Sequence, residues 1–275
     1  MEDKTIFTET YKVRSTQVNL NNQLGLYGVL GMLQDIAAEH ASLLGFGYEE
    51  LVKKGFFWAL IQQKLKMHYW PQWNERITVK TWSTETMSPS LSTTLEEGMP
   101  CTTWSLPIQG VYAFREFELF CNDQKIGECA STWITLDIQT RRPIELTDRQ
   151  EIFSPRTEGG LSFHTDRINL PEGMYQVNDF KVRVSDLDVN SHVNNVKYTQ
   201  WALDMMTERN HREFVIKEYD INFLSETFMG DEMQGFKSKG KYIDDAHNLV
   251  ETYLYAQKIG APKPAFISRW IAERI

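Results

Sequence analysis

Cysteine is scarce in this 275-residue sequence, which has three, Cys101, Cys121 and Cys129, and no CxxC pair. This usage argues against a disulfide framework and fits a reducing compartment. No apolar run reaches the roughly 20 residues of a membrane span. No His, Asp or Cys spacing forms a metal ligand set, and Gly45-Phe46-Gly47 lacks the rest of any phosphate-binding motif. We therefore expect a soluble protein without a metal or cofactor.

Positive charge is also limited. The sequence has 29 Lys and Arg against 37 Asp and Glu, a formal net charge of −8, which argues against binding to nucleic acid or anionic membranes. The N-terminal residues 1–7 resemble neither a signal peptide nor a transit peptide, so we expect a cytoplasmic protein. With 41% hydrophobic residues, the chain can fill two cores, and its length suits two domains of roughly 130 residues.

The second half of the sequence repeats the first. Tyr11–Arg14 matches Phe180–Arg183 at an offset of 169 residues, and Ser131–Ile134 matches Ser268–Ile271 at an offset of 137. Between them, Trp73–Glu75 matches Met229–Asp231 at an offset of 156. The falling offset places an insertion in the first copy at Thr84–Gly110, which is rich in Ser, Thr and Pro and which we interpret as a long loop.

Each copy has the pattern of a strand, a long amphipathic helix and about four antiparallel strands. In the first copy we expect strands at 8–18, 56–69, 76–83, 111–120 and 126–137, and a helix beginning at 26. A sheet of this kind can wrap around its helix. The pattern predicts an α+β fold, a tandem double hot-dog, with an N-terminal hot-dog at 1–140, a linker at 141–171 and a C-terminal hot-dog at 172–275. We expect a monomer or a homodimer.

A cluster of polar side chains precedes the helix of the second copy. Asp188, Asn190 and His192 alternate along the sequence, so in an extended loop they would share one face. The backbone N–H groups near Asn194 and Asn195, at the helix start, can hold a developing negative charge. An Asp- and Asn-rich segment before a helix is also typical of a simple cap, so the pattern alone leaves both interpretations open.

The first copy lacks these titratable groups. Its aligned positions hold Asn19 and Gln23 in place of the Asp and the His, and Trp70 in place of Glu226 of the second copy. Residues required only for folding would be required in both copies. The asymmetry therefore favours a catalytic second copy and a first copy that binds or serves as a scaffold.

A longer match points to a family. Ser185–Tyr198, with the sequence SDLDVNSHVNNVKY, resembles the signature of acyl-acyl carrier protein thioesterases, the plant and bacterial enzymes that end fatty-acid synthesis. Leu33–His40 resembles the first helix of the family, Trp70–Trp73 its first-copy turn, and Thr140–Pro143 the end of its first copy. The resemblance implies hydrolysis of fatty acyl thioesters of acyl carrier protein, which would be the macromolecular partner, with release of free fatty acid.

The resemblance also implies a catalytic set. The Asp, Asn and His of the signature fall on Asp188, Asn190 and His192, and the family's Glu-Cys pair falls on Glu226 and Thr227, a departure at the Cys position. We hypothesise that Glu226 is the general base for water, with direct attack by the carboxylate as a fallback. His192 would orient the water or the carboxylate and protonate the leaving thiol. Asn190 would bind the carbonyl oxygen or hold the imidazole, and Asp188 would fix the loop or the His tautomer. Thr227 is a possible accessory residue.

Two further expectations concern geometry. Strict alternation along the strand before Glu226 turns this residue away from the face it needs, unless the strand ends or bulges near Ser225. An acyl chain needs an apolar tunnel, and its candidate lining in the first copy is Gly28, Met32, Phe57, Trp58 and Ile61. These five residues are also compatible with ordinary core packing.

Three alternatives remain open from sequence. The first two, ranked below acyl carrier protein thioester hydrolysis, are an acyl-CoA thioesterase on the same fold and a non-catalytic acyl-binding protein built from paired hot-dogs. A hot-dog hydratase also uses Asp and His before a helix, although the signature resembles thioesterases more closely.

Overall fold

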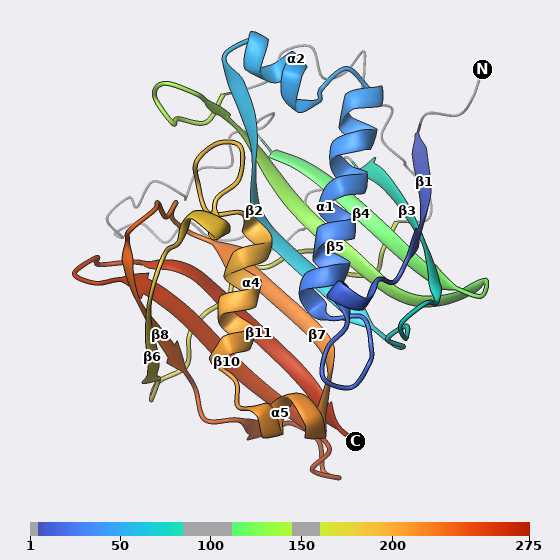
Figure 1. Cartoon of the computed structure of the whole chain (residues 1–275), viewed down its shortest axis with the longest axis vertical. Coiled ribbons are helices and arrows are strands. Elements are labelled where there is room, and N and C mark those ends of the chain that lie inside the picture. Colours follow the sequence, from blue (N-terminus) through green and yellow to red (C-terminus); the bar gives the residue numbers. More distant parts are fainter. Residues whose placement is uncertain (1–4, 85–111, 145–159) are drawn as a thin grey trace, which may run out of the picture.

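The computed structural model describes residues 5–84, 112–144 and 160–275 of the chain (Figure 1). Residues 85–110 of the predicted loop and residues 145–159 of the predicted linker lie outside these ranges. None of the helices in the described part combines the length and the hydropathy that crossing a membrane requires.

The elements follow the predicted order in both copies. The first copy contains β1 (Ile6–Lys12), α1 (Leu26–Leu43), α2 (Tyr48–Lys53), β2 (Phe56–Met67), β3 (Arg76–Thr84), β4 (Tyr112–Cys121) and β5 (Gln124–Asp137). The second contains β6 (Tyr175–Lys181), α4 (Asn195–Asp204), α5 (Glu208–Glu213), β7 (Phe214–Phe223), β8 (Glu232–Lys237), β9 (Lys241–Tyr242), β10 (Leu249–Lys258) and β11 (Pro264–Arg274). β1 ends earlier than predicted because the chain turns into a 3-10 helix at Ser15–Gln17.

All the described strands form one antiparallel sheet. Its order is β1-β3-β4-β5-β2-β7-β11-β10-β8-β6, with β9 beside β10, so the two halves have the same order when read outward from the centre. At the centre, β2 pairs with β7, and Lys64 lies opposite Asp220 with Nζ 3.4 Å from the carboxylate. These two residues are 156 positions apart, one of the repeat offsets, so the pseudo-twofold axis passes through this pair. The predicted tandem double hot-dog is confirmed.

The helices α1 and α4 lie side by side on one face of the sheet, in contact with each other (Figure 1). The helix of the second copy has an apolar side that is buried: Tyr198, Trp201, Ala202 and Met205 are at most 8% exposed. One continuous core joins the copies. The indole N–H of Trp70 adds a polar link, donating to the carbonyl of Ile216 at 2.8 Å. The face opposite the helices is crossed by the end of the linker, where the backbone N–H of Ile168 donates to Asn222 Oδ1 at 2.8 Å.

The prediction of a long helix in each copy is wrong for the second. α1 has 18 residues, whereas α4 has 10. After α4, Thr207 and Asn210 form a capping box, in which each side chain accepts a hydrogen bond from the other residue's backbone N–H. Because this cap satisfies the first N–H groups of a new helix, it favours a fresh start at α5 over continuation of α4.

Candidate active site

The predicted polar loop is a tight turn. Asp188 Oδ1 accepts hydrogen bonds from the backbone N–H groups of Asn190 (2.8 Å) and His192 (3.4 Å), and the N–H of Asp188 donates to the carbonyl of His192 at 2.8 Å. Ser191 has a φ of +60°. The expectation of an extended loop with alternating side chains is therefore wrong, because the Asp188 carboxylate folds the backbone over itself.

The first copy makes the same turn without a carboxylate. Asn19 Oδ1 accepts from the backbone N–H groups of Asn21 (2.9 Å) and Gln23 (3.1 Å), and Asn22 has a φ of +58°. An amide oxygen thus suffices for this backbone geometry. It follows that the turn requires an acceptor at position 188 but not a negative charge.

The structure brings His192 and Glu226 together. β7 ends at Phe223, before the predicted Ser225, so Glu226 lies on the following segment and its direction is not fixed by strand alternation. Its Oε1 is 3.1 Å from Nδ1 of His192. Of the two possibilities that the sequence left open, a bulge or a strand end near Ser225, the structure has the strand end. The catalytic role of the pair stays a prediction.

A third residue completes the cluster, and sequence reasoning assigned it no role. Arg141, just after β5 of the first copy, places one guanidinium nitrogen 3.3 Å from Glu226 Oε1 and the other 3.0 Å from Nε2 of His192. Its guanidinium also lies over the ring of Phe57, 4.9 Å from the centroid. The available signal was the family-like segment Thr140–Pro143, which contains this arginine.

Arg141 fixes the tautomer of the imidazole. A guanidinium only donates hydrogen bonds, so Nε2 of His192 is the acceptor. In the neutral ring the proton is then on Nδ1, which donates it to Glu226 Oε1. The carboxylate of Glu226 therefore receives two donors that fix its orientation, and the tautomer is set by Arg141 and not by Asp188.

The turn that presents Arg141 is held by Asp137. Asp137 Oδ1 accepts from the backbone N–H and the hydroxyl of Thr140, at 2.6 and 2.9 Å, and from the N–H of Gln139 at 3.0 Å. The hydrogen bonds from Thr140, followed by that from Gln139, lower the pKa of the Asp137 carboxyl. Arg141 itself has a φ of +57°.

Thr227, at the family's cysteine position, is directed into the interior. It is 1% exposed, and its hydroxyl lies 2.8 Å from the hydroxyl of Tyr198 on α4. Its carbonyl accepts from the N–H of Val193 at 3.2 Å. Burial raises the pKa of Tyr198 to about 12, so both hydroxyls are neutral near pH 7. These contacts give Thr227 a structural function in holding the helix and the polar loop to the segment that carries Glu226.

A cavity of about 520 Å³ adjoins the turn. It lies between α1 and strands of the first copy and the polar loop of the second, and residues that line it include Ala37, Ala38, Phe57, Trp58, Asn190 and Asn195. The predicted acyl-chain residues thus divide into two groups. Phe57 and Trp58 line this cavity, whereas Gly28, Met32 and Ile61 are not among its lining residues.

The three residues that do not line the cavity lie elsewhere in the fold. A side chain at Gly28 would meet Leu24 and Gln17, so this glycine faces its own loop. Met32 is 3% exposed within the common core. Ile61 lies at the irregularity of β2, where its pairing with β5 shifts register. Period-based reasoning could not separate residues that line the cavity from residues that fill the core, because both are apolar.

The amide groups at the start of α4 differ in availability. The N–H of Asn194 donates to the carbonyl of Asp186 at 2.9 Å, and its Oδ1 caps the N–H of Val196 at 2.9 Å. The backbone N–H of Asn194 is therefore already hydrogen-bonded within the protein, contrary to the oxyanion role expected for it. The side chain of Asn190 makes no hydrogen bond to the described residues and lines the cavity, so its N–H₂ group is free to donate to a ligand oxygen.

The wall formed by β3 and β4 carries a buried arginine. Arg115 is 7% exposed and donates to Thr81 Oγ1 at 3.1 Å and to His40 Nδ1 at 2.8 Å. Burial lowers the pKa of Arg115 to about 10, which leaves it charged near pH 7. The cavity therefore has a polar group at a wall away from the turn. In the described residues, no group of three or more His, Cys, Asp or Glu side chains is arranged to hold a metal ion.

These features define a class of protein with two hot-dog copies on one sheet. Of the two described polar turns, that of the second copy has the imidazole–carboxylate pair, and the first copy helps to form the cavity beside it. Models of known families agree with this class. The model for the acyl-ACP thioesterase N-terminal domain matches residues 4–88, and that for the C-terminal domain matches residues 171–270. The chain belongs to the acyl-ACP thioesterase family.

Individual relatives are distant. An oleoyl-acyl carrier protein thioesterase of Coriandrum sativum is 25% identical over 221 residues, which cover 74% of this chain and 54% of that protein. A dodecanoyl-[acyl-carrier-protein] hydrolase of Cinnamomum camphora is 23% identical over 267 residues, which cover 90% and 63%. The chain thus spans about half to two-thirds of the length of these curated relatives.

Solved structures support the same fold. An acyl-ACP thioesterase from Bacteroides thetaiotaomicron matches with a TM-score of 0.79 at 22% identity, covering 98% of both chains. The 12:0-ACP thioesterase from Umbellularia californica matches with a TM-score of 0.78 at 16% identity, covering 98% of this chain and 95% of that one.

Proposed function

We propose that the chain hydrolyses fatty acyl thioesters of acyl carrier protein, releasing a free fatty acid and the carrier thiol. The observation that carries the proposal is the 3.1 Å contact between His192 and Glu226, beside a cavity lined by Phe57, Trp58 and Asn190. Membership of the family, and the activities for which its relatives are named, support the same reaction.

The proposed chemistry uses water as the nucleophile. The oxygen of water bonds to the thioester carbonyl carbon while Glu226 takes a proton from that water. Asn190 donates to the carbonyl oxygen as negative charge develops on it. The carbon–sulfur bond then breaks, and the leaving thiolate takes the proton that Glu226 received from the water, while the Nδ1–H of His192 holds the carboxylate in place. The products are a carboxylic acid and a thiol, with no cofactor.

The first copy contributes to the reaction in this scheme. Arg141 holds the Glu226 carboxylate, and α1 with Phe57 and Trp58 provides the apolar walls for the acyl chain. Neither cysteine that the structure describes suits a nucleophile in this scheme, because Cys121 and Cys129 are buried in the first copy, and Thr227 occupies the family's cysteine position.

The test is a Glu226→Gln variant assayed on a panel of acyl carrier protein thioesters. Because the substitution removes the base and keeps the shape, we expect kcat to fall about 10²- to 10⁴-fold with unchanged folding. The matched control is Glu208→Gln, which removes another exposed carboxylate paired with an arginine, at 2.9 Å from Arg212. Wild-type turnover by Glu226→Gln would contradict the assignment.

The same panel separates the alternatives. A higher kcat/KM for coenzyme A thioesters than for carrier-protein thioesters would favour an acyl-CoA thioesterase. Absence of hydrolysis with retained acyl binding would favour the non-catalytic binding protein. The cytoplasmic location expected from the sequence stays a prediction, to be checked by fractionation of the source cells.

A further inference from the structure

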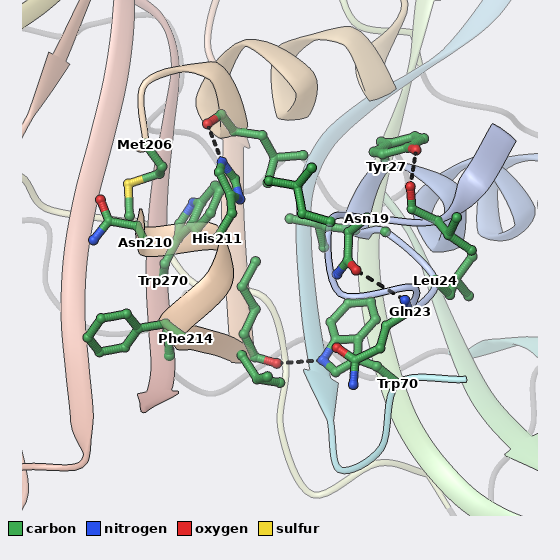
Figure 2. A pocket seen from close by; sticks show the side chains of 18 of the residues that line it. Asn19, Gln23, Leu24, Tyr27, Trp70, Met206, Asn210, His211, Phe214 and Trp270 are labelled. Carbon is green, nitrogen blue, oxygen red and sulfur yellow. Dashed lines mark hydrogen bonds between the residues drawn. The ribbon is translucent and has the colours of Figure 1, made fainter. Parts of the chain in front are cut away.

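A second cavity, of about 560 Å³, lies between the copies on the other side of the pseudo-twofold axis (Figure 2). Its volume is within the ~300–1,000 Å³ typical of small-molecule sites. It is formed by the polar turn of the first copy together with α4, α5, β7 and β11 of the second. Residues that line it include Asn19, Gln23, Trp70, Leu203, His211 and Trp270.

The repeat makes this cavity the counterpart of the candidate active site. At an offset of 169 residues, Asn19 corresponds to Asp188 and Leu203 to Gln34; at 137, Trp270 corresponds to Trp133. Both members of each pair line their respective cavities. The two sites therefore have the same plan, a turn from one copy placed against the helix and sheet of the other.

The second cavity has lost the groups needed for hydrolysis. Trp70 occupies the position of Glu226, and its indole N–H is already bonded to the carbonyl of Ile216 at 2.8 Å. Gln23 occupies the position of His192, so the imidazole–carboxylate pair is missing from this turn. The apolar walls remain, because Leu203 lines the cavity together with Met206, Phe214 and Trp270, which Figure 2 labels.

The polar groups of the cavity favour an uncharged head group. None of the residues that the structure shows lining it is Lys or Arg, and Asp204 is among them, so a carboxylate ligand would meet repulsion without a counter-charge. The side-chain amides of Gln23 and Gln200 make no hydrogen bonds within the described residues, and each offers both donors and an acceptor. His211 Nε2 donates to the carbonyl of Leu203 at 3.0 Å, so this N–H is not available to donate to a ligand.

We propose that the second cavity binds an apolar chain with an uncharged, amide- or ester-like head group and holds it without hydrolysis. The ligand class follows from the apolar walls, the free amides and the lack of a basic side chain in the lining. This inference does not depend on hydrolysis at the other site, because its ligand need not be a substrate.

The experiment is calorimetric titration of the full chain with decanamide, which is not a thioester and carries an uncharged head. Two pseudo-symmetric variants fill the cavities one at a time: Leu203→Trp fills the second, and Gln34→Trp fills the candidate active site. We expect two equivalents bound by the wild type, one by each variant and none by the double variant. In Gln34→Trp, decanoate at pH 8 should bind at least tenfold more weakly than decanamide.

Each outcome is decisive. If Leu203→Trp leaves the stoichiometry unchanged, or if Gln34→Trp removes all binding, the second site does not exist. Equal affinity of decanoate and decanamide in Gln34→Trp would overturn the uncharged head group. If the wild type binds one equivalent of decanamide, and this binding is kept in Gln34→Trp and lost in Leu203→Trp, the second site is supported. The same result counts against the proposed function, because the candidate active site then binds no chain. Should Leu203→Trp unfold, Leu20→Trp, at the exposed rim, replaces it.

Discussion

Arg141 provides the sharpest test of the cluster, because it follows the last strand of the first copy and contacts groups of the second. The perturbation is Arg141→Ala. It removes the contacts to Glu226 and His192, at 3.3 and 3.0 Å, and the stacking over Phe57. The expected result is a loss of turnover without a comparable loss of stability.

The magnitudes follow from exposure. The Arg141 and Glu226 side chains are 41% and 37% exposed, and solvent-exposed pairs contribute about 0–1 kcal/mol to stability. An exposed cation–π contact adds roughly 0.5–1 kcal/mol. The free energy of unfolding should therefore fall by no more than about 2 kcal/mol. Turnover depends on the orientation of the carboxylate, and we expect kcat to fall about 10- to 100-fold, or roughly 1.4 to 2.7 kcal/mol of transition-state stabilisation.

The assay is steady-state hydrolysis of an acyl carrier protein thioester, with chemical denaturation measured in parallel. KM should change by less than about threefold, since Arg141 contacts Glu226 and His192 and does not line the cavity proposed for the acyl chain. Arg141→Lys keeps the charge but cannot donate to both acceptors from one planar fork, so its kcat should lie between those of wild type and Arg141→Ala. The control is Arg142→Ala, at the exposed neighbouring position. Full turnover by Arg141→Ala, or an equal loss in the control, would refute the reasoning.

Three more predictions follow from single contacts. Asp188→Asn should fold normally and keep kcat within about fivefold of the wild-type value, because Asn19 makes the same turn with an amide oxygen. Asp188→Ala removes the acceptor and should lose both the folded turn and the activity. Thr227→Val should lower the free energy of unfolding by about 1–3 kcal/mol, by leaving the buried Tyr198 hydroxyl without its partner, and change kcat less than threefold. Asp137→Ala should reduce kcat toward the value for Arg141→Ala, because it releases the turn that presents the arginine.

Their measurements are urea unfolding and steady-state kinetics. A 100-fold loss of kcat in Asp188→Asn would show that the charge itself is needed. If Thr227→Val has unchanged stability and a large loss of kcat, the Thr227 hydroxyl takes part in catalysis and its function is not only structural. The pKa of Asp137 is lowered in the folded state, so its contribution to the turn is present above its ordinary pKa of 3.8 and is lost as the pH falls through the lowered value. Wild type and Asp137→Ala should therefore differ at pH 7 and converge in acid.

The sequence by itself determined the architecture and the asymmetry between the copies. Three repeat offsets identified two copies, and one of them, 156 residues, is the spacing of Lys64 and Asp220 on the axis. Placing Glu226 opposite Trp70 separated the copy with titratable groups from the copy without them. These inferences succeeded because strand and helix periods are local properties of the chain.

Tertiary structure alone decided how the groups meet. Arg141 lies 51 residues from His192 and 85 from Glu226 along the chain, and only the shared sheet brings their loops together. It also decided that Phe57 and Trp58 face a cavity while Met32 fills the core. The hydrophobicity of a side chain predicts that it is buried but not which residues it packs against. Contacts between distant loops and the position of a cavity are therefore set only by the packed fold.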